Sequence, residues 1–159
     1  MWRSSLFSNC RLSVLPEWID YNGHMNVGFY GVAFDKATDV LLEHVGAGEE
    51  YRHKANASTF VLEAHLTYDR EVGEGDLLRF ETLVVDADQK RMHVFHTMYH
   101  DAEGYLAATN ELMIIHVDLS IRRASRFPLE IYTKIDNMVA KSRGFERPTR
   151  MGRIISIRP

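Results

Sequence analysis

The sequence predicts an α+β domain in which one curved antiparallel sheet wraps around a single long helix. Residues 27–45 form an apolar stretch with the period of a helix, and four later stretches between residues 59 and 117 have the length and alternation of strands. No second long helical segment is available to cover the sheet. The sheet itself must therefore enclose the helix.

The composition is that of one ordinary globular domain. With 159 residues the chain can form a core that needs neither a disulfide nor a metal. The single cysteine, Cys10, excludes an internal disulfide and fits a reducing compartment. Residues 1–9 lack the apolar stretch of a signal peptide, and no apolar run reaches membrane-spanning length. We expect a cytoplasmic protein with no membrane partner.

The first half of the chain supplies one strand and the long helix. A short apolar strand around Leu12 and Val14, with about ten residues before it, leads into a polar turn. The predicted buried stripe of the helix is Tyr30, Ala33, Phe34, Ala37 and Leu41. Further apolar residues, Phe29, Val32 and Val40, indicate that the helix is buried over much of its girth, and glycines 46 and 48 end it.

The second half supplies four strands and a short helix. A polar loop at 49–57 precedes strands at 59–68, 77–87, 92–100 and 106–117, the last two joined by a turn at 101–104. The first of these alternates as a half-buried strand, with one side formed by Phe60, Leu62, Ala64, Leu66 and Tyr68. Pro128 is predicted to begin a helix with Ile131, Ile135, Met138 and Val139 on its buried face. We expect one domain over residues 1–142 and a basic tail at 143–159, in which 154–157 is a strand or an unpacked end.

Charge is distributed unevenly along the chain. The net charge is −3, yet residues 120–159 carry ten Lys and Arg against three Asp and Glu, which leaves the rest of the chain at −10. A basic end on an acidic body favours binding to a polyanion such as a phosphate group, or is a solvated tail.

The turn at residues 20–26 carries the chemistry that we expect. Asn26 is a good N-cap for the long helix, and this places Asp20 beside the helix N-terminus. Free N–H groups there suit a carbonyl that becomes an oxyanion while a carboxylate, or the water it activates, attacks it. The alternative is that Asp20 only caps the turn. We interpret the chain as an enzyme.

The turn Asp20-Tyr21-Asn22-Gly23-His24-Met25-Asn26 and the strand order together resemble hotdog-fold acyl-CoA thioesterases of the 4-hydroxybenzoyl-CoA thioesterase type. The resemblance covers roughly residues 10–142. It implies that Asp20 is the nucleophile or the general base, and that the Val27 N–H, with Gly28 as neighbour, is the oxyanion donor. His24 either orients Asp20 or the substrate carbonyl, or is a packed side chain. We expect Asn26 mainly to cap the helix and only secondarily to contact the substrate.

The resemblance also implies how the substrate is held. The basic residues expected to bind the phosphates of coenzyme A are Lys90, Arg91, Arg122, Arg123 and Arg126, together with Ser125. The site of this superfamily lies between subunits, so a homodimer, or a homotetramer of paired dimers, is implied. No cofactor, metal or nucleic acid is expected, and coenzyme A enters as part of the substrate.

Residues 15–26 more specifically resemble the thioesterases of carnitine breakdown, which hydrolyse betainyl-CoA. The trimethylammonium group of that substrate is held by aromatic faces, and the aromatic residues flanking Asp20 are Trp18, Tyr21, Phe29 and Tyr30. Trp18 is also a good core residue. Glu63 either lines a neighbouring subunit's pocket or faces solvent.

Other interpretations of the sequence remain open or can be excluded. Asp35 and Asp39 either act as the catalytic carboxylate on the central helix or are solvated. A zinc site at His93, His96 and His100 is excluded by strand geometry. On a strand His93 points away from His96 and His100, and these two stand about 13 Å apart. A non-catalytic acyl-CoA sensor and a hotdog enoyl-CoA hydratase using Asp20 and His24 are the alternative functions.

Overall fold

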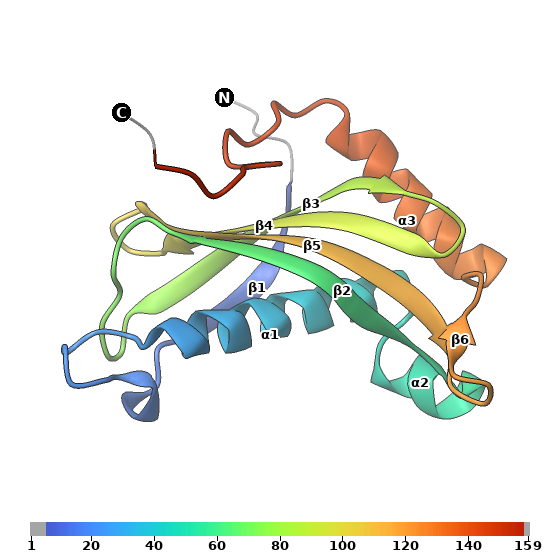
Figure 1. Cartoon of the computed structure of the whole chain (residues 1–159), viewed down its shortest axis with the longest axis horizontal. Helices are drawn as coiled ribbons and strands as arrows, with labels where there is room; N and C mark the ends of the chain where they lie inside the picture. The colour runs from blue at the N-terminus through green and yellow to red at the C-terminus, as the bar shows by residue number, and fades with distance from the viewer. Residues whose placement is uncertain (1–5, 158–159) are drawn as a thin grey trace.

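The computed structural model describes residues 6–157, and its single antiparallel sheet curls around one long helix as predicted (Figure 1). The sheet order is β1-β3-β4-β5-β2, with the short β6 paired to β5. The strands are β1 (Phe7–Ser13), β2 (Ala57–Tyr68), β3 (Leu77–Ala87), β4 (Arg91–His100), β5 (Leu106–Asp118) and β6 (Arg123–Ala124). The helices are η1 (Pro16–Trp18), α1 (Val27–Val45), α2 (Glu49–Ala55) and α3 (Leu129–Ser142).

Helix α1 begins and ends where its sequence signals predict. The side chain of Asn26 accepts the Gly28 N–H at 3.0 Å, and Gly46 ends the helix in the left-handed conformation at φ 86°. The five residues of the predicted stripe are all buried. The prediction that α1 is buried over much of its girth was wrong, because the sheet covers only one side of the helix. Val32, on another side, is 42% exposed.

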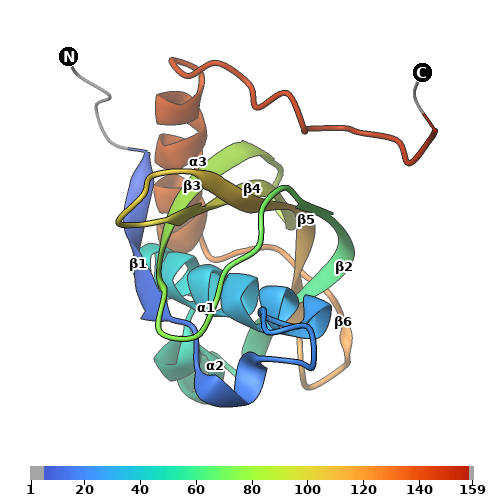
Figure 2. The same cartoon turned by 90° about the vertical axis from the view of Figure 1, so that its left-hand side faces the viewer.

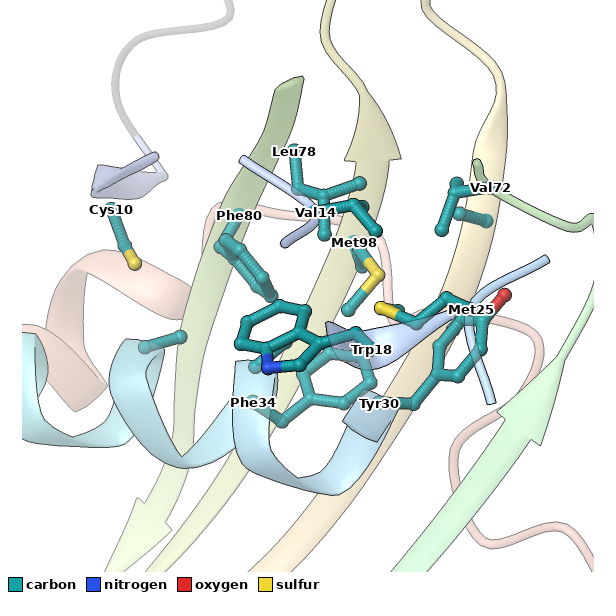
Figure 3. Close-up of a cluster of buried hydrophobic side chains, with 14 residues drawn as sticks. Cys10, Val14, Trp18, Met25, Tyr30, Phe34, Val72, Leu78, Phe80 and Met98 are labelled. Carbon is teal, nitrogen blue, oxygen red and sulfur yellow. The ribbon is translucent and has the colours of Figure 1, made fainter. Parts of the chain in front are cut away.

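The core consists of two clusters that follow the length of α1. Around its N-terminal half, Trp18, Met25, Tyr30 and Phe34 pack with residues of β1, β3 and β4 (Figure 3). Around its C-terminal half, Leu41 and Val45 pack against the sheet and against α3. The predicted face of α3 is confirmed for Ile131, Ile135 and Val139, which are buried, while Met138 is partly buried.

Strand β2 differs from the half-buried strand that alternation predicts. It lies at the edge of the sheet, and Phe60, Leu62 and Tyr68 of the predicted buried side are 46%, 58% and 49% exposed. A bulge between Val61 and Glu63 also shifts the alternation of the side chains. In the single chain, β2 therefore presents a free edge with apolar side chains.

The polar loop expected at residues 49–57 is instead largely helix α2. Its first turn carries Glu49 and Glu50 and its last turn carries Arg52, His53 and Lys54, so the charges complement the helix dipole. None of its residues is fully buried. A helix of this kind has no apolar stripe, which is why periodicity missed it.

Two boundaries near the termini also differ from expectation. The first strand starts earlier than predicted, at Phe7, and α3 starts at Leu129 with Pro128 in the capping position. The C-terminal segment after α3 runs over the face of the sheet opposite to α1 (Figures 1 and 2). Arg150 pairs with Asp69 there, and residues 154–157 form no strand. Residues 158 and 159 of the expected tail lie outside the described residues.

Candidate active site

The turn before α1 is held by hydrogen bonds that converge on Asp20. Its N–H donates to the His24 carbonyl at 3.1 Å, and its carbonyl accepts the Gly23 N–H at 3.0 Å. Oδ1 of its side chain accepts the Asn22 N–H at 2.9 Å. Gly23 has φ 81°, a conformation that glycine adopts without a steric penalty. The sequence thus builds a tight loop that fixes one carboxylate.

Asn26 connects this carboxylate to the start of α1. Its Nδ2 donates to Oδ2 of Asp20 at 3.1 Å, while its Oδ1 caps the Gly28 N–H. The cap occupies the Gly28 N–H, so that group is not free to donate to a substrate. In the described part of the chain the Val27 N–H has no hydrogen-bond partner, and its side chain is exposed. One free donor at a helix N-terminus thus lies next to the asparagine that holds Asp20.

His24 does not contact the Asp20 side chain. Its Nε2 lies 3.2 Å from Oε1 of Glu71, in the loop that follows β2. Pairing with Glu71 orients the His24 ring, but it removes the direct orienting contact with Asp20 that the sequence allowed. Glu71 was not singled out from the sequence, because it lies about fifty residues away from this turn.

The aromatic residues around Asp20 do not form a common cage. Trp18 belongs to the core (Figure 3). Its ring stacks on Phe29, with ring centroids 5.7 Å apart. Tyr21 points into solvent at 98% exposure. Tyr30 is buried, and its ring meets the edge of Tyr68 with centroids 5.1 Å apart. The Tyr30 and Tyr68 pair borders a hollow of about 280 Å³, which Val27 also lines.

A larger cavity lies along the other half of α1. It measures about 480 Å³, between the exposed side of α1, α2 and the first half of β2. Its lining includes the carboxylates Asp35, Asp39, Glu43 and Glu49, the cation Arg52, and the apolar Leu42, Phe60 and Val61. Partial burial raises the pKa of Asp39, and the neighbouring Asp35 and Glu43 raise it further. From sequence spacing alone, Asp35 and Asp39 were either catalytic or solvated residues of the helix.

The residues expected to bind coenzyme A lie close together at this same end of the molecule. The Lys90 carbonyl accepts the His116 N–H, and the Gln89 carbonyl accepts the Phe127 N–H, each at 2.8 Å. These bonds join the β3–β4 turn to the segment that carries Arg122, Arg123, Ser125 and Arg126. Arg91 is already paired, because its Nε and Nη2 both bond Oδ2 of Asp88. Glu63 is exposed on β2.

The histidines on β4 have separate partners. His93 pairs with Glu111 at 2.7 Å, His100 lies 3.3 Å from Asp76, and His96 is bonded between two threonines in the core. Residues 6–157 contain no group of three or more His, Cys, Asp or Glu placed to hold a metal ion. Across the same residues, no helix is long and apolar enough to span a membrane.

The chain belongs to the thioesterase-like superfamily, whose family model matches residues 14–135. The fold and this match together define a hotdog-fold thioester hydrolase that acts on acyl-CoA.

Individual relatives are consistent with that class. The betainyl-CoA thioesterase of Pseudomonas aeruginosa is 35% identical over 156 residues, which cover 98% of each chain. An L-carnitine dehydrogenase/betainyl-CoA thioesterase of Agrobacterium fabrum is 35% identical over 127 residues, 80% of this chain and 26% of that protein. A Staphylococcus aureus protein solved in complex with CoA superposes with a TM-score of 0.89 at 30% identity, over 97% of this chain and 96% of that one.

Proposed function

We propose that the protein hydrolyses a small acyl-CoA, with Asp20 as the nucleophile or the general base and the Val27 N–H as the oxyanion donor. The observation that carries this proposal is the Asn26 bridge. One side chain both holds the Asp20 carboxylate and caps α1, next to a helix N–H without a partner. As the carbonyl oxygen of the thioester gains negative charge, that N–H stabilises it while Asp20 or its water attacks the carbon.

We further propose that two copies of the chain complete each site. Asp20 lies just before α1, whereas the acidic cavity lies along α1 from Asp35 to Glu43. The β3–β4 turn and β6, which belong to the basic segments, lie at the C-terminal end of α1 (Figure 1). With 19 residues, α1 is about 28 Å long. If β2 pairs antiparallel with β2 of a second copy, the Tyr68 end of one strand meets the Ala57 end of the other. The free apolar edge of β2 supports this pairing, in a dimer or a pair of dimers.

Mixing two variants that are each impaired with the acyl-CoA substrate tests this arrangement. One variant carries Asp20→Asn, and the other carries Arg122→Gln with Arg126→Gln. In a mixed dimer with shared sites, one of the two sites receives Asp20 and both arginines intact. Co-refolded protein should then recover about a quarter of wild-type activity, since half of the dimers are mixed. No recovery in dimers shown by native mass spectrometry to be mixed would place each site within one chain.

Betainyl-CoA is the acyl-CoA that we propose as substrate. Its trimethylammonium group is a cation without hydrogen-bond donors, so negative charge and aromatic faces must recognise it. The aromatic cage expected around Asp20 is not formed, but the cavity beside α1 offers Asp35, Asp39 and Glu43 opposite Phe60. The names of the relatives from Pseudomonas and Agrobacterium support the same substrate.

A neutral analogue separates charge recognition from shape. The 3,3-dimethylbutanoyl thioester of CoA has the size of the betainyl thioester, with carbon in place of the cationic nitrogen. We expect Asp35→Asn with Asp39→Asn to lower kcat/KM for betainyl-CoA about tenfold and to leave the neutral analogue within about twofold. Glu130→Gln on α3 is the matched control, because Glu130 is also an exposed acid paired with a lysine. Equal losses for both thioesters would contradict a cation site.

Hydration of an enoyl-CoA is not favoured by this geometry. That chemistry, as anticipated from the sequence, requires Asp20 and His24 to act together, and His24 is paired with Glu71 instead. We infer a cytoplasmic location and no requirement for a cofactor, in keeping with a lone free cysteine and with a mechanism that needs only a carboxylate and water.

A further inference from the structure

His116 on β5 joins three segments that meet at the basic end of the molecule. Its side chain is 2% exposed. Nε2 lies 2.8 Å from the Tyr51 hydroxyl of α2, and Nδ1 lies 2.9 Å from Oγ and 3.1 Å from the carbonyl of Ser125. The His116 N–H also donates to the Lys90 carbonyl at 2.8 Å. We call His116, Tyr51 and Ser125 the His116 hub.

The carbonyl of Ser125 determines how the protons of the hub are arranged. A carbonyl oxygen accepts only, so its contact with Nδ1 of His116 favours the tautomer in which Nδ1 carries the hydrogen and Nε2 accepts from the Tyr51 O–H. Burial lowers the pKa of His116, and burial together with Asp118 raises the pKa of Tyr51. A neutral imidazole therefore lies between a hydroxyl donor and a carbonyl acceptor, and each of its ring nitrogens is satisfied.

This proton arrangement excludes a nucleophilic role for Ser125. A serine and a histidine at 2.9 Å resemble the nucleophile and base of a hydrolase. A base must accept the serine proton, yet Nδ1 already carries a hydrogen, and the other nitrogen is occupied by Tyr51. The hub therefore holds segments in place and carries out no proton transfer.

The segments that it holds are the basic ones. The Ser125 N–H donates to the His116 carbonyl at 3.0 Å, so side chain and backbone both fasten the segment of Arg122, Arg123 and Arg126 to β5. Arg122 has φ 51°, a conformation that costs energy for a residue with a side chain and persists only where the surroundings impose it. On the other side, the Lys90 carbonyl accepts the backbone N–H of the same histidine, a bond that does not depend on the imidazole.

We propose that the His116 hub is a positioning device for coenzyme A, because it holds the segment Arg122–Arg126 in the arrangement that receives the phosphate groups. This inference rests on the proposed phosphate-binding function of those basic residues. Exposed arginines on an unfixed loop would have to be ordered at the moment of binding. A backbone that is already fixed reduces that cost and raises the affinity for the nucleotide part of the substrate.

Truncating the substrate distinguishes positioning from general structural support. An acyl-pantetheine thioester keeps the reacting group and lacks the nucleotide phosphates. We expect Tyr51→Phe, which deletes one hydroxyl, to raise KM for the acyl-CoA about three- to tenfold and to change KM for the acyl-pantetheine much less. The preference of the enzyme for the CoA thioester should therefore fall. Loss of structure would instead lower turnover of both substrates together.

Four further variants make the result decisive. Tyr132→Phe deletes a tyrosine hydroxyl on α3, outside the hub, and should leave the preference unchanged. His116→Gln, which retains a donor and an acceptor, should reduce the preference less than His116→Leu, and these two replace Tyr51→Phe if that variant does not fold. Arg122→Gln with Arg126→Gln tests the phosphate site directly.

The outcomes separate the two proposals. If the arginine variant loses the preference and the hub variants keep it, the hub is structural and the positioning inference is overturned. If the arginine variant also keeps it, the phosphate site itself is wrong, and the inference falls with it. Loss of the preference in both sets, with circular dichroism spectra unchanged, supports positioning.

Discussion

The two ends of α1 carry different parts of one chemistry. At its N-terminal end, Asp20 and the Val27 N–H are fixed next to Asn26, with only a shallow hollow bordered by Tyr30 and Tyr68. Near its C-terminal end lie the 480 Å³ cavity and the basic segments. There a carboxylate oxygen of Glu43 accepts the Glu49 N–H that begins α2 at 2.8 Å, so that N–H is not free to donate to a substrate. In the proposed mechanism the first end breaks the thioester bond and the second end binds the substrate. On that proposal each end needs its counterpart from another chain.

Removing the charge of Asp20 is the most severe test of the first end. We expect Asp20→Asn to lower kcat about 10³-fold, because the amide is neither a nucleophile nor a base. The fold should persist, since the amide oxygen still accepts the Asn22 N–H. Thiol release from acyl-CoA measures turnover, and calorimetry with free coenzyme A should show unchanged binding.

The control for this variant is Asp136→Asn on the exposed side of α3. Full activity in Asp20→Asn would transfer the catalytic role to the cavity beside α1, where Asp35 is the next carboxylate. The comparison between the two ends would then be reversed.

The middle of α1 should respond to pH through stability and not through catalysis. His96 lies there, bonded to Thr38 of α1 and Thr82 of β3, and complete burial lowers its pKa to about 3. In the unfolded chain His96 takes up a proton near pH 6.5, whereas in the folded chain its lowered pKa keeps it neutral at that pH. The contribution to stability is therefore complete above pH 6.5 and is lost progressively as the pH falls toward 3.

Between pH 6.5 and pH 5 this loss amounts to about 2 kcal/mol of unfolding free energy. Urea unfolding at both pH values measures it. In His96→Gln the difference in unfolding free energy between the two pH values should be smaller by that amount. The carboxylates contribute equally to this difference in both proteins. An identical pH dependence in the variant would show that His96 is protonated in the folded state.

The smallest expected effect concerns Asn26, at the N-terminal end of α1. Asn26→Ala removes the cap of α1 and should cost about 1 kcal/mol of unfolding free energy. It also frees the Asp20 carboxylate, so we expect kcat to fall as well. Asn22→Ala in the same turn is the control, because Asn22 contributes its backbone N–H to Asp20. If both variants lose equal activity, the Asn26 bridge has no special role.

Local signals in the sequence were enough to predict most of the fold. The stripe on α1, its asparagine cap and its terminal glycine all follow from spacing and from residue type, and the structure confirms them. Helix α2 could not be found in this way, because it is stabilised by charges at its ends and buries none of its residues fully. Strand β2 was misjudged because alternation shows which residues share a face, and not whether anything covers that face.

Sequence spacing determined that Asp20 and Asn26 meet at the start of a helix, since six residues in a tight turn leave few other arrangements. Only the tertiary structure decided the partners that come from distant segments. His24 faces Glu71, four acids of α1 and α2 line one cavity with β2, and His116 is bonded to Tyr51 and Ser125. The physical reason is that the curl of the sheet and the packing of α2 against its edge, rather than any local propensity, bring those side chains together.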